Sequence, residues 1–337
     1  MSTQTNASLT HKPKILVARA IFPEALVKLE ELYEVHSNQS DRVMSAEALQ
    51  KALSDVQGAL VTGSERIDTA ALTMAKDLKV VANISVGYNN FDVPAMTAAG
   101  VLATNTPDVL TDTTADFGFA LLMATARRIT ESEHWVRAGK WDQWSIVNNP
   151  LGMDLHNSTV GIIGMGRIGQ GIAKRALGFG MKVIYHNRSQ LSAEDEEACG
   201  ASYVSKESLL QNADHVVLVL PYTAQNHHTI GAAEIALMKP TATLVNIARG
   251  GIVDDSALAQ ALQARKIFAA GLDVFEGEPK VHPELLKCSN IVLAPHIASA
   301  TEKTRRAMVD LAIENLRAAL DGKKPPSLIN TEVFSKA

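Results

Sequence analysis

Three side chains that could do acid–base chemistry follow three successive apolar runs in the second half of the chain. Arg249 comes after the run 242–247, Glu278 after 268–275, and His296 after 291–294. Such runs predict buried parallel strands, whose carboxyl ends meet at one edge of a sheet. We therefore expect one site. Each residue alone also fits a plainer role: a phosphate contact for Arg249, a solvated loop charge for Glu278, and a helix start for His296.

Together, Arg, Glu and His suit the reduction of a 2-oxo acid by a hydride donor. A guanidinium can hold a carboxylate and the adjacent carbonyl oxygen at once, which orients the carbonyl carbon. A histidine can supply the proton that this oxygen needs near neutral pH. A carboxylate on the other ring nitrogen holds the ring and favours its charged form. These roles would fall on Arg249, His296 and Glu278.

Residues 159–188 predict a binding unit for a dinucleotide, which could be that donor. An apolar run at 159–163 is followed by the turn G-M-G-R-I-G at 164–169, a helical pattern to Gly180 and a second apolar run at 182–186. The glycines would allow the tight turn, the approach of backbone to a pyrophosphate, and the packing of a helix whose first amides face the phosphates. A glycine-rich turn that binds no nucleotide is the plainer alternative.

The segment just after the run 182–186 distinguishes between the two nicotinamide dinucleotides. NAD enzymes place an Asp or Glu about 20 residues beyond the glycine turn, where it binds the ribose 2′-hydroxyl. This chain has Asn187-Arg188-Ser189 there, and its next acids, at 194–196, come too late. Arg188 could pair with a 2′-phosphate, and its neighbours could donate hydrogen bonds. We expect NADPH to be preferred, with NADH as the weaker cofactor.

The first hundred residues predict a second parallel α/β sheet. Apolar runs at 15–18, 58–62, 79–84 and 101–105 alternate with helical patterns such as 23–33 and 46–54. The loop S-V-G-Y-N-N at 85–90 follows one of these runs, and Gly87 would let its backbone amides form an anion-binding nest. From these residues alone, an ordinary strand-to-helix turn is slightly favoured.

Two long helical patterns, 111–128 and 301–320, bracket the glycine-turn unit. We expect the chain to cross between domains at these places. A dinucleotide-binding domain at 107–299 would then be inserted in a discontinuous domain made of 12–106 and 300–332. Arg127 and Arg128 would match the charge preference of a helix C-terminus. The polar residues 1–11 predict a flexible tail and no signal peptide.

Composition excludes several functional classes for the 337 residues. A net charge of −4 with 46% hydrophobic and 20% charged residues argues against a nucleic-acid or anionic-membrane partner. No apolar run is long enough for a membrane span. Cys199 and Cys288 lack metal-ligand spacing and predict reduced thiols, so we expect no metal site and a cytoplasmic protein.

These features together resemble the D-isomer-specific 2-hydroxyacid dehydrogenases over about residues 14–330. The resemblance rests on the segments 160–169, 246–250, 270–279 and 295–301. It implies two doubly wound parallel-sheet domains, a Rossmann coenzyme domain inserted in a flavodoxin-like substrate domain. Arg249, Glu278 and His296 match the family's catalytic residues. Val86 and Gly87 match the loop that holds the substrate carboxylate, which reverses the preference for an ordinary turn there.

The resemblance and the residues together define the expected contacts. Asp273 matches the residue that contacts the nicotinamide carboxamide, whereas Tyr222 departs from the Leu that relatives usually carry. Substrate contacts are expected at Val86, Gly87, Arg249, His296 and Ser299. Cofactor contacts are expected at Gly164, Gly166, Arg167, Ile168, Gly169, Asn187, Arg188, Ser189, Pro221, Ile247, Asp273 and Ala298.

Within the family, the segment 105–116 is most similar to the glyoxylate/hydroxypyruvate reductases and to the reductases of 2-ketogluconate. That likeness implies a homodimer in which Trp141 or Trp144 walls the partner's site, although a plain surface loop also explains these residues. Alternatives are an NAD-dependent D-2-hydroxyacid or phosphoglycerate dehydrogenase, and a dinucleotide-sensing corepressor that does no catalysis.

Overall fold

The computed structural model describes residues 12–335, which form two compact units. The first unit comprises the chain up to Leu110 together with the chain from Glu302 onward, and the second comprises Thr111–Thr301. These divisions lie within a few residues of the domain limits expected from the sequence. The predicted tail 1–11 lies outside the described residues.

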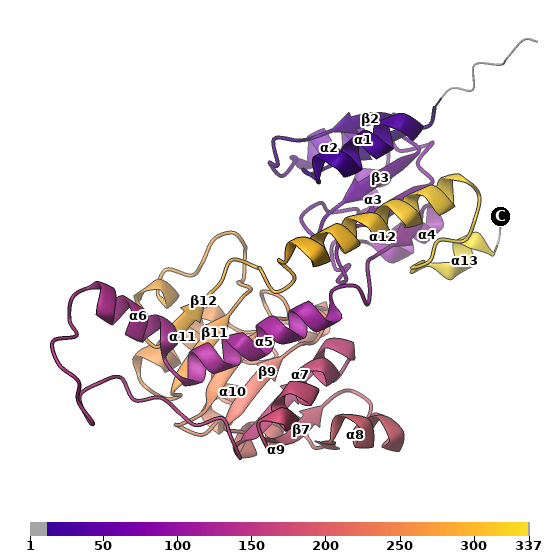
Figure 1. The fold of residues 1–337 in the computed structure, drawn as a ribbon. Helices are drawn as coiled ribbons and strands as arrows, with labels where there is room; N and C mark the ends of the chain where they lie inside the picture. Colours follow the sequence, from indigo (N-terminus) through magenta and orange to yellow (C-terminus); the bar gives the residue numbers. More distant parts are fainter. Residues whose placement is uncertain (1–11, 336–337) are drawn as a thin grey trace, which may run out of the picture. The chain divides into compact units, whose positions relative to one another are not determined.

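The first unit is a parallel five-stranded sheet with the strand order β2-β1-β3-β4-β5, the flavodoxin-like order. Its elements appear in Figure 1. In chain order they are β1 (Lys14–Val17), α1 (Pro23–Leu32), β2 (Glu34–Ser37), α2 (Ala46–Leu53), β3 (Gly58–Val61), α3 (Thr69–Leu72), β4 (Val80–Asn83), α4 (Val93–Ala98), β5 (Leu102–Thr104), α12 (Glu302–Leu320) and α13 (Thr331–Phe334).

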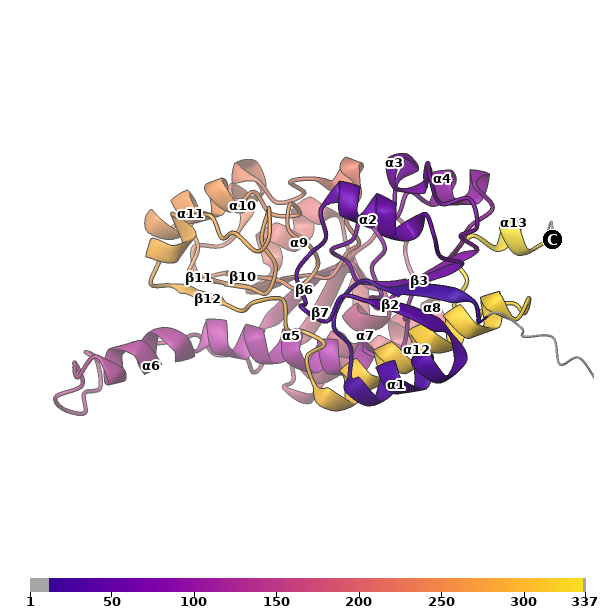
Figure 2. The same cartoon turned by 90° about the horizontal axis from the view of Figure 1, so that it is seen from above.

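Helices cover both faces of this first sheet (Figure 2). One face packs under α2, α3 and α4, and the other under α1 and α12. A Cβ at Gly58 would come within 2.6 Å of a methyl group of Leu316 on α12, so the Leu316 side chain would have to shift to admit one. The chain after α12 then returns to the edge of the sheet, where Leu328 forms an antiparallel bridge with Thr104.

The second unit is a parallel seven-stranded sheet with the order β12-β11-β10-β9-β6-β7-β8. Counted from β6, this is the Rossmann order 3-2-1-4-5-6 with one further strand at the edge. In chain order its elements are α5 (Thr111–Ala126), α6 (Ile129–Arg137), β6 (Thr159–Ile163), α7 (Arg167–Gly178), β7 (Lys182–His186), α8 (Ala193–Cys199), β8 (Ala201–Tyr203), α9 (Lys206–Asn212), β9 (His215–Leu218), η1 (Ala224–Asn226), α10 (Ala232–Leu237), β10 (Thr243–Asn246), α11 (Asp255–Gln263), β11 (Ala269–Leu272), η2 (Leu285–Lys287) and β12 (Ile291–Leu293).

Two separate apolar layers lie on the two faces of the second sheet. One forms under α9, α10 and α11, and the other under α5, α7 and α8. The predicted fold class, two doubly wound parallel-sheet domains, is therefore confirmed. Among the described residues, no helix has the length and apolar character that a membrane crossing requires.

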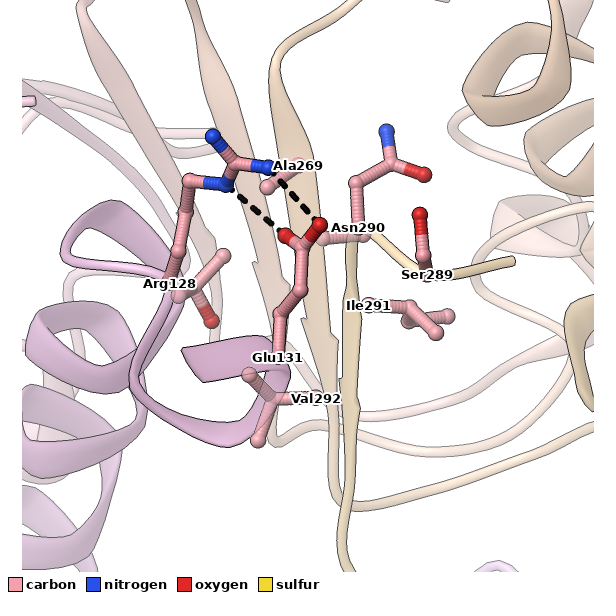
Figure 3. A pocket seen from close by; sticks show the side chains of 9 residues that line it. Arg128, Glu131, Ala269, Ser289, Asn290, Ile291 and Val292 are labelled. Carbon is pink, nitrogen blue, oxygen red and sulfur yellow. Dashed lines mark hydrogen bonds and ion pairs between the residues drawn. The ribbon is translucent and has the colours of Figure 1, made fainter. Parts of the chain in front are cut away.

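The long helix expected at 111–128 is shorter than predicted, because α5 ends at Ala126 and a separate helix, α6, starts at Ile129. Arg128 between them has φ 53°, a left-handed conformation that breaks the helix. Its guanidinium makes two hydrogen bonds of 2.7 Å to Glu131 (Figure 3) and one of 3.2 Å to the Leu151 carbonyl. Arg128 thus fixes the start of α6 and is not a C-terminal charge of α5.

Arg128 and Glu131 also line a small pocket between α6 and the strands β11 and β12 (Figure 3). Its volume of about 10 Å³ is room for little more than one water molecule. This pocket is too small for a 2-oxo acid or a dinucleotide.

The strands β2 and β8 were not predicted. Both are edge strands, and neither β2 (EVHS) nor β8 (ASY) has a continuous apolar run that would mark a strand in the sequence. The predicted strand 268–275 is longer than the observed one, because β11 runs only from Ala269 to Leu272. Beyond the end of β11, Val274 and Phe275 are apolar and buried.

Candidate active site

His296 and Glu278 form a direct pair at the carboxyl edge of the second sheet. His296 Nδ1 lies 2.8 Å from Glu278 Oε2, and Glu278 Oε1 accepts from the Phe275 amide at 2.9 Å. Burial raises the pKa of Glu278, but the His296 hydrogen bond and charge, the Phe275 amide and Arg249 outweigh it, so the pKa is lowered overall. An ionised Glu278 favours a proton on Nδ1, which leaves Nε2 as the nitrogen available to a ligand.

A buried carboxylate holds the loop that presents His296. Asp273 follows β11, is fully buried, and accepts from the amides of Ile297 at 2.8 Å and Ala298 at 2.9 Å. His296 adopts φ 55°, a left-handed conformation that costs energy for a residue with a side chain and needs support from its surroundings. Burial raises the pKa of Asp273, and the two amide hydrogen bonds offset this only in part.

Arg249 lies on the turn after β10, and a side-chain amide shapes that turn. Asn246, the last residue of β10, accepts from the Ala248 amide at 3.0 Å and donates to the Arg249 carbonyl at 3.2 Å. The guanidinium donates to the Ala248 carbonyl at 2.7 Å and is half-buried. Burial lowers the pKa of Arg249, and the charge of Glu278 opposes that change. Gly250 packs against the Phe275 carbonyl so closely that no side chain would fit.

The glycine turn has the geometry that a bound pyrophosphate requires. Gly164 has φ 104° and lies against the backbone of Leu220, where a Cβ would come within 2.7 Å of the Leu220 nitrogen. Gly169 packs α7 against the Gly164 carbonyl. Gly166 precedes the first residue of α7 and has open space where a side chain would stand, and no side chain caps the helix. The space and the amides at this helix start fit a phosphate group.

The residues after β7 divide between a structural contact and an exposed charge. Asn187 Oδ1 accepts from the Met165 amide at 2.7 Å, so this side chain helps to shape the glycine turn. The side-chain NH₂ group of Asn187 has no protein acceptor within the described residues. Arg188 and Ser189 are exposed, and Arg188 has no ion-pair partner among residues 12–335. No acid follows β7 directly, since the acids at 194–196 lie on α8 as predicted.

In the first unit, side-chain amides hold the loop 85–90 after β4. Asn83 donates to the Gly87 carbonyl at 2.9 Å, and Asn105 donates to the Val86 carbonyl at 2.8 Å. Asn90 donates to the carbonyls of Thr62 at 3.0 Å and Glu65 at 2.9 Å. In the part of the chain that the structure describes, the Val86 and Gly87 amides have no acceptor. The loop therefore offers N–H groups, as an anion site needs.

Several side chains that hold the loops of the candidate site were not predicted from the sequence. Asn83 and Asn246 share a signal that could have revealed them, because each is the polar last residue of an otherwise apolar or β-branched strand. The remaining predicted contacts lie along the carboxyl edge of the second sheet or at the start of α7. Pro221 is exposed after β9, Ile247 and Ala298 are buried, Ser299 is half-buried beyond His296, and Arg167 and Ile168 open α7.

Trp141 and Trp144 lie in the loop after α6, where they are 53% and 72% exposed. Ile146, Val147 and Leu151 in the same loop are exposed as well. We refer to residues 129–151 as the α6 arm, which projects away from the second sheet in both views (Figure 1, Figure 2). Neither tryptophan is buried in its own unit.

Comparison with known proteins gives a consistent result. Residues 119–298 match the family model for the NAD-binding domain of the D-isomer specific 2-hydroxyacid dehydrogenases. A glyoxylate reductase of Thermococcus onnurineus is 46% identical over 96% of this chain and 98% of its own length.

Solved structures agree with this assignment. An NADPH-dependent glyoxylate/hydroxypyruvate reductase of Sinorhizobium meliloti, crystallised with NADP and malonate, superposes with a TM-score of 0.84 at 35% identity, over 94% of this chain and 97% of that one. A glyoxylate reductase from Paecilomyes thermophila superposes with a TM-score of 0.86 at 32% identity, over 95% of this chain and 99% of that one. With its Rossmann unit, its glycine turn and these matches, the chain belongs to the D-isomer specific 2-hydroxyacid dehydrogenases, oxidoreductases that use a nicotinamide dinucleotide.

Proposed function

We propose that the protein is an NADPH-preferring reductase that converts small 2-oxo acids to D-2-hydroxy acids. The expected substrates are glyoxylate and hydroxypyruvate, which give glycolate and D-glycerate, with 2-ketogluconate as a larger candidate. The observation that carries the proposal is the His296–Glu278 pair at 2.8 Å, on the same sheet edge as Arg249. Relatives named glyoxylate reductase, at 46% identity, support this substrate class.

The bound dinucleotide would supply the hydride, and the residues of this chain would handle charge and proton. His296 would donate a proton from Nε2 to the carbonyl oxygen, while Glu278 stabilises the charge on the ring. The planar guanidinium of Arg249 would hold the carbonyl oxygen and one carboxylate oxygen together. The amides of Val86 and Gly87 would bind the rest of the carboxylate. Glu278 is a positioning residue in this scheme.

The preference for NADPH rests on Arg188 and on the absence of an acid after β7. An acid there would repel a 2′-phosphate, whereas the exposed guanidinium of Arg188 would pair with it. Asn187, whose oxygen is engaged by the Met165 amide, has its NH₂ group left to donate. The similar Sinorhizobium meliloti reductase is described as NADPH-dependent, which agrees with the proposal.

The decisive assay compares kcat/KM for glyoxylate, hydroxypyruvate and 2-ketogluconate, each with NADPH and with NADH. We expect turnover within the ordinary range of about 1–10³ s⁻¹ on at least one acid, with NADPH favoured. An NADH value that equals or exceeds the NADPH value would overturn the cofactor preference and favour an NAD-dependent dehydrogenase. Turnover below a few per minute on all three acids would favour a dinucleotide-sensing binding protein.

Arg188→Ala sharpens the same assay. Losing one charge-assisted contact of about 1.5–3 kcal/mol should raise KM for NADPH about 10- to 100-fold and leave KM for NADH nearly unchanged. Lys182→Ala is a matched control, because this lysine is also exposed and lies at the end of β7 opposite to Arg188. Equal losses with both cofactors would show that Arg188 does not read the 2′-phosphate.

We also propose that the protein is a homodimer in which the α6 arm contacts the partner. Its exposed side chains include two tryptophans and three aliphatic residues within 141–151, a composition typical of interfaces. Light scattering after gel filtration should give twice the 36.1 kDa chain mass. Trp144→Ser should weaken the dimer and raise KM for the 2-oxo acid. A monomeric wild-type protein would exclude this arrangement.

A further inference from the structure

A second cluster of potential ligands lies at the carboxyl edge of the second sheet, apart from the His296–Glu278 pair. His227 and His228 follow η1, and Glu276 follows β11. One ligand atom from each of the three lies within 4.8 Å of the other two. Nothing in the proposed reduction uses these three side chains.

In both histidines, Nε2 is the ring nitrogen that faces the Glu276 carboxylate. His228 Nε2 lies 3.0 Å from Glu276 Oε2, and His227 Nε2 lies 3.8 Å from Glu276 Oε1. Zinc binds nitrogen and carboxylate ligands at about 2.0–2.2 Å, so tetrahedral ligands stand about 3.3–3.5 Å apart. The two separations lie on either side of that value, although they end on different oxygens of Glu276, so an ion would enter once a histidine ring turns.

The outer nitrogens of the two rings also have partners. His227 Nδ1 lies 3.2 Å from the Tyr222 hydroxyl, and His228 Nδ1 lies 4.0 Å from Asp254 Oδ2. Histidines that bind metals commonly form a hydrogen bond through the second nitrogen, which fixes the ring and leaves the other nitrogen for the ion. His227 does so with Tyr222, whereas 4.0 Å is too long for a hydrogen bond from His228 to Asp254. The two rings are stacked, with centroids 3.8 Å and planes 24° apart, so one ring must turn before both Nε2 lone pairs can point at a single ion.

We propose that His227, His228 and Glu276 form a site for a divalent transition-metal ion, with zinc as the best match. Two imidazoles and one carboxylate suit Zn²⁺, Co²⁺ or Ni²⁺ better than Mg²⁺ or Ca²⁺, which prefer oxygen ligands. The ion can enter from solvent, because each side chain is between about one third and one half exposed. His228 and Glu276 also line an open pocket of about 670 Å³, which leaves room for water as a further ligand.

The bound ion would join two loops that have different roles in the proposed site. His227 and His228 belong to the segment that follows β9, next to the expected cofactor contact Pro221. Glu276 lies two residues before Glu278, on the turn whose Phe275 amide holds that carboxylate. Metal binding would therefore restrain the turn that carries Glu278, and the site itself would exist whatever substrate the enzyme reduces.

The test is calorimetric titration of the full chain, free of any histidine tag and stripped with a chelator, with ZnCl₂ near pH 7.5. We expect one ion per chain with a Kd well below 100 µM. The same protein titrated with CoCl₂ should give visible absorption bands that mark nitrogen ligation in a site of low coordination number. No binding below 100 µM zinc would overturn the proposal.

Variants locate the site within the chain. Glu276→Gln and His228→Ala should each weaken zinc binding at least about 10-fold, since even the loss of an outer-shell partner costs 10- to 100-fold. His134→Ala and His282→Ala serve as controls, because these histidines lie outside the cluster. Thermal unfolding without metal checks that each variant folds. Binding that survives both cluster variants, or that is lost in a control, would overturn the assignment.

Discussion

The loop after β4 in the first unit and the loop after β12 in the second use the backbone in opposite ways. In the first loop, Asn105 and Asn83 donate to the carbonyls of Val86 and Gly87, which leaves the N–H groups of those residues free of protein acceptors within the described chain. In the second, the Asp273 carboxylate accepts from the N–H groups of Ile297 and Ala298. The loop after β4 therefore has backbone N–H groups available to a ligand, whereas the loop after β12 presents the His296 side chain.

The difference shows why an amide holds one loop and a carboxylate the other. A carboxylate beside Val86 and Gly87 would consume the N–H groups and repel an anionic substrate. A carboxamide in place of Asp273 has only one acceptor oxygen for two amides. In the proposed site, the supporting side chain would therefore determine which part of each loop can meet a negative substrate. Four substitutions or conditions test this comparison, from the largest expected effect to the smallest.

Replacement of His296, which the loop after β12 presents, should have the largest effect. We expect His296→Ala to slow reduction about 10²- to 10⁴-fold, because the proton donor is lost. The rate would be measured as kcat with NADPH, and cofactor affinity by quenching of its fluorescence. Affinity should stay within a factor of a few of wild type, and an equal loss in NADPH affinity would point to a structural role for His296.

Replacement of Asp273, whose carboxylate holds the loop after β12, should destabilise the protein. Asp273→Ala leaves the buried Ala298 amide and the partly buried Ile297 amide without acceptors, and the loss at a buried amide costs about 1–3 kcal/mol. The relief of a buried charge offsets part of this, so we expect a net loss of about 1–3 kcal/mol in the free energy of unfolding, measured with urea. Asp273→Asn keeps one acceptor and should lose less. Two variants of equal stability to wild type would show that Asp273 does not support the loop.

Replacement of Asn83, whose amide holds the loop after β4, should affect substrate binding more than turnover. Asn83→Ala frees the Gly87 carbonyl and lets the peptide rotate, so we expect KM for the 2-oxo acid to rise about 10-fold while kcat changes less. Asn330→Ala is the matched control, because this buried amide in the same unit holds Ala103 and Val101 through similar bonds. An equal rise in KM in the control would mean that general loosening, and not the loop, is responsible.

The smallest expected effect is the change with pH in the contribution of Glu278 to stability. The pKa of Glu278 is lowered in the folded protein, so its ionised form stabilises the fold above the ordinary Glu pKa of about 4.3. That contribution is lost as the pH falls through the lowered value. The stability difference between wild type and Glu278→Gln, measured by thermal unfolding, should shrink from pH 6 to pH 3.5. A difference that is constant or grows toward acid would contradict the lowered pKa.

The central strands and the functional loops at the carboxyl edges were predictable, because buried parallel strands are continuous apolar runs that end where the polar residues begin. The edge strands β2 and β8 were not, since they are half-covered and their sequences carry no such run. The break at Arg128 was also missed. A left-handed arginine is specified by its contacts with Glu131 and Leu151, and the Leu151 contact is distant in the sequence.

The site shows the same limit. Arg249, Glu278 and His296 could be chosen from their chemistry and their places after strands. The roles of Asn83, Asn105 and Asn246 depend on which carbonyl lies within reach, and that is a property of the folded loops. Asp273 was expected to contact the cofactor, and the structure adds a backbone role that no spacing in the sequence indicates.

The packing of α12 on the first sheet has a consequence for how the chain is made. Ala312, Leu316 and Ala319 cover a face formed by Ile15, Val17, Leu60 and their neighbours, yet the ribosome adds α12 only after residues 111–301. The second unit is continuous and can fold as it emerges, whereas the first stays open on one face until synthesis is nearly complete. The part of the chain before Thr111 is thus the part of a nascent chain that most needs protection from aggregation.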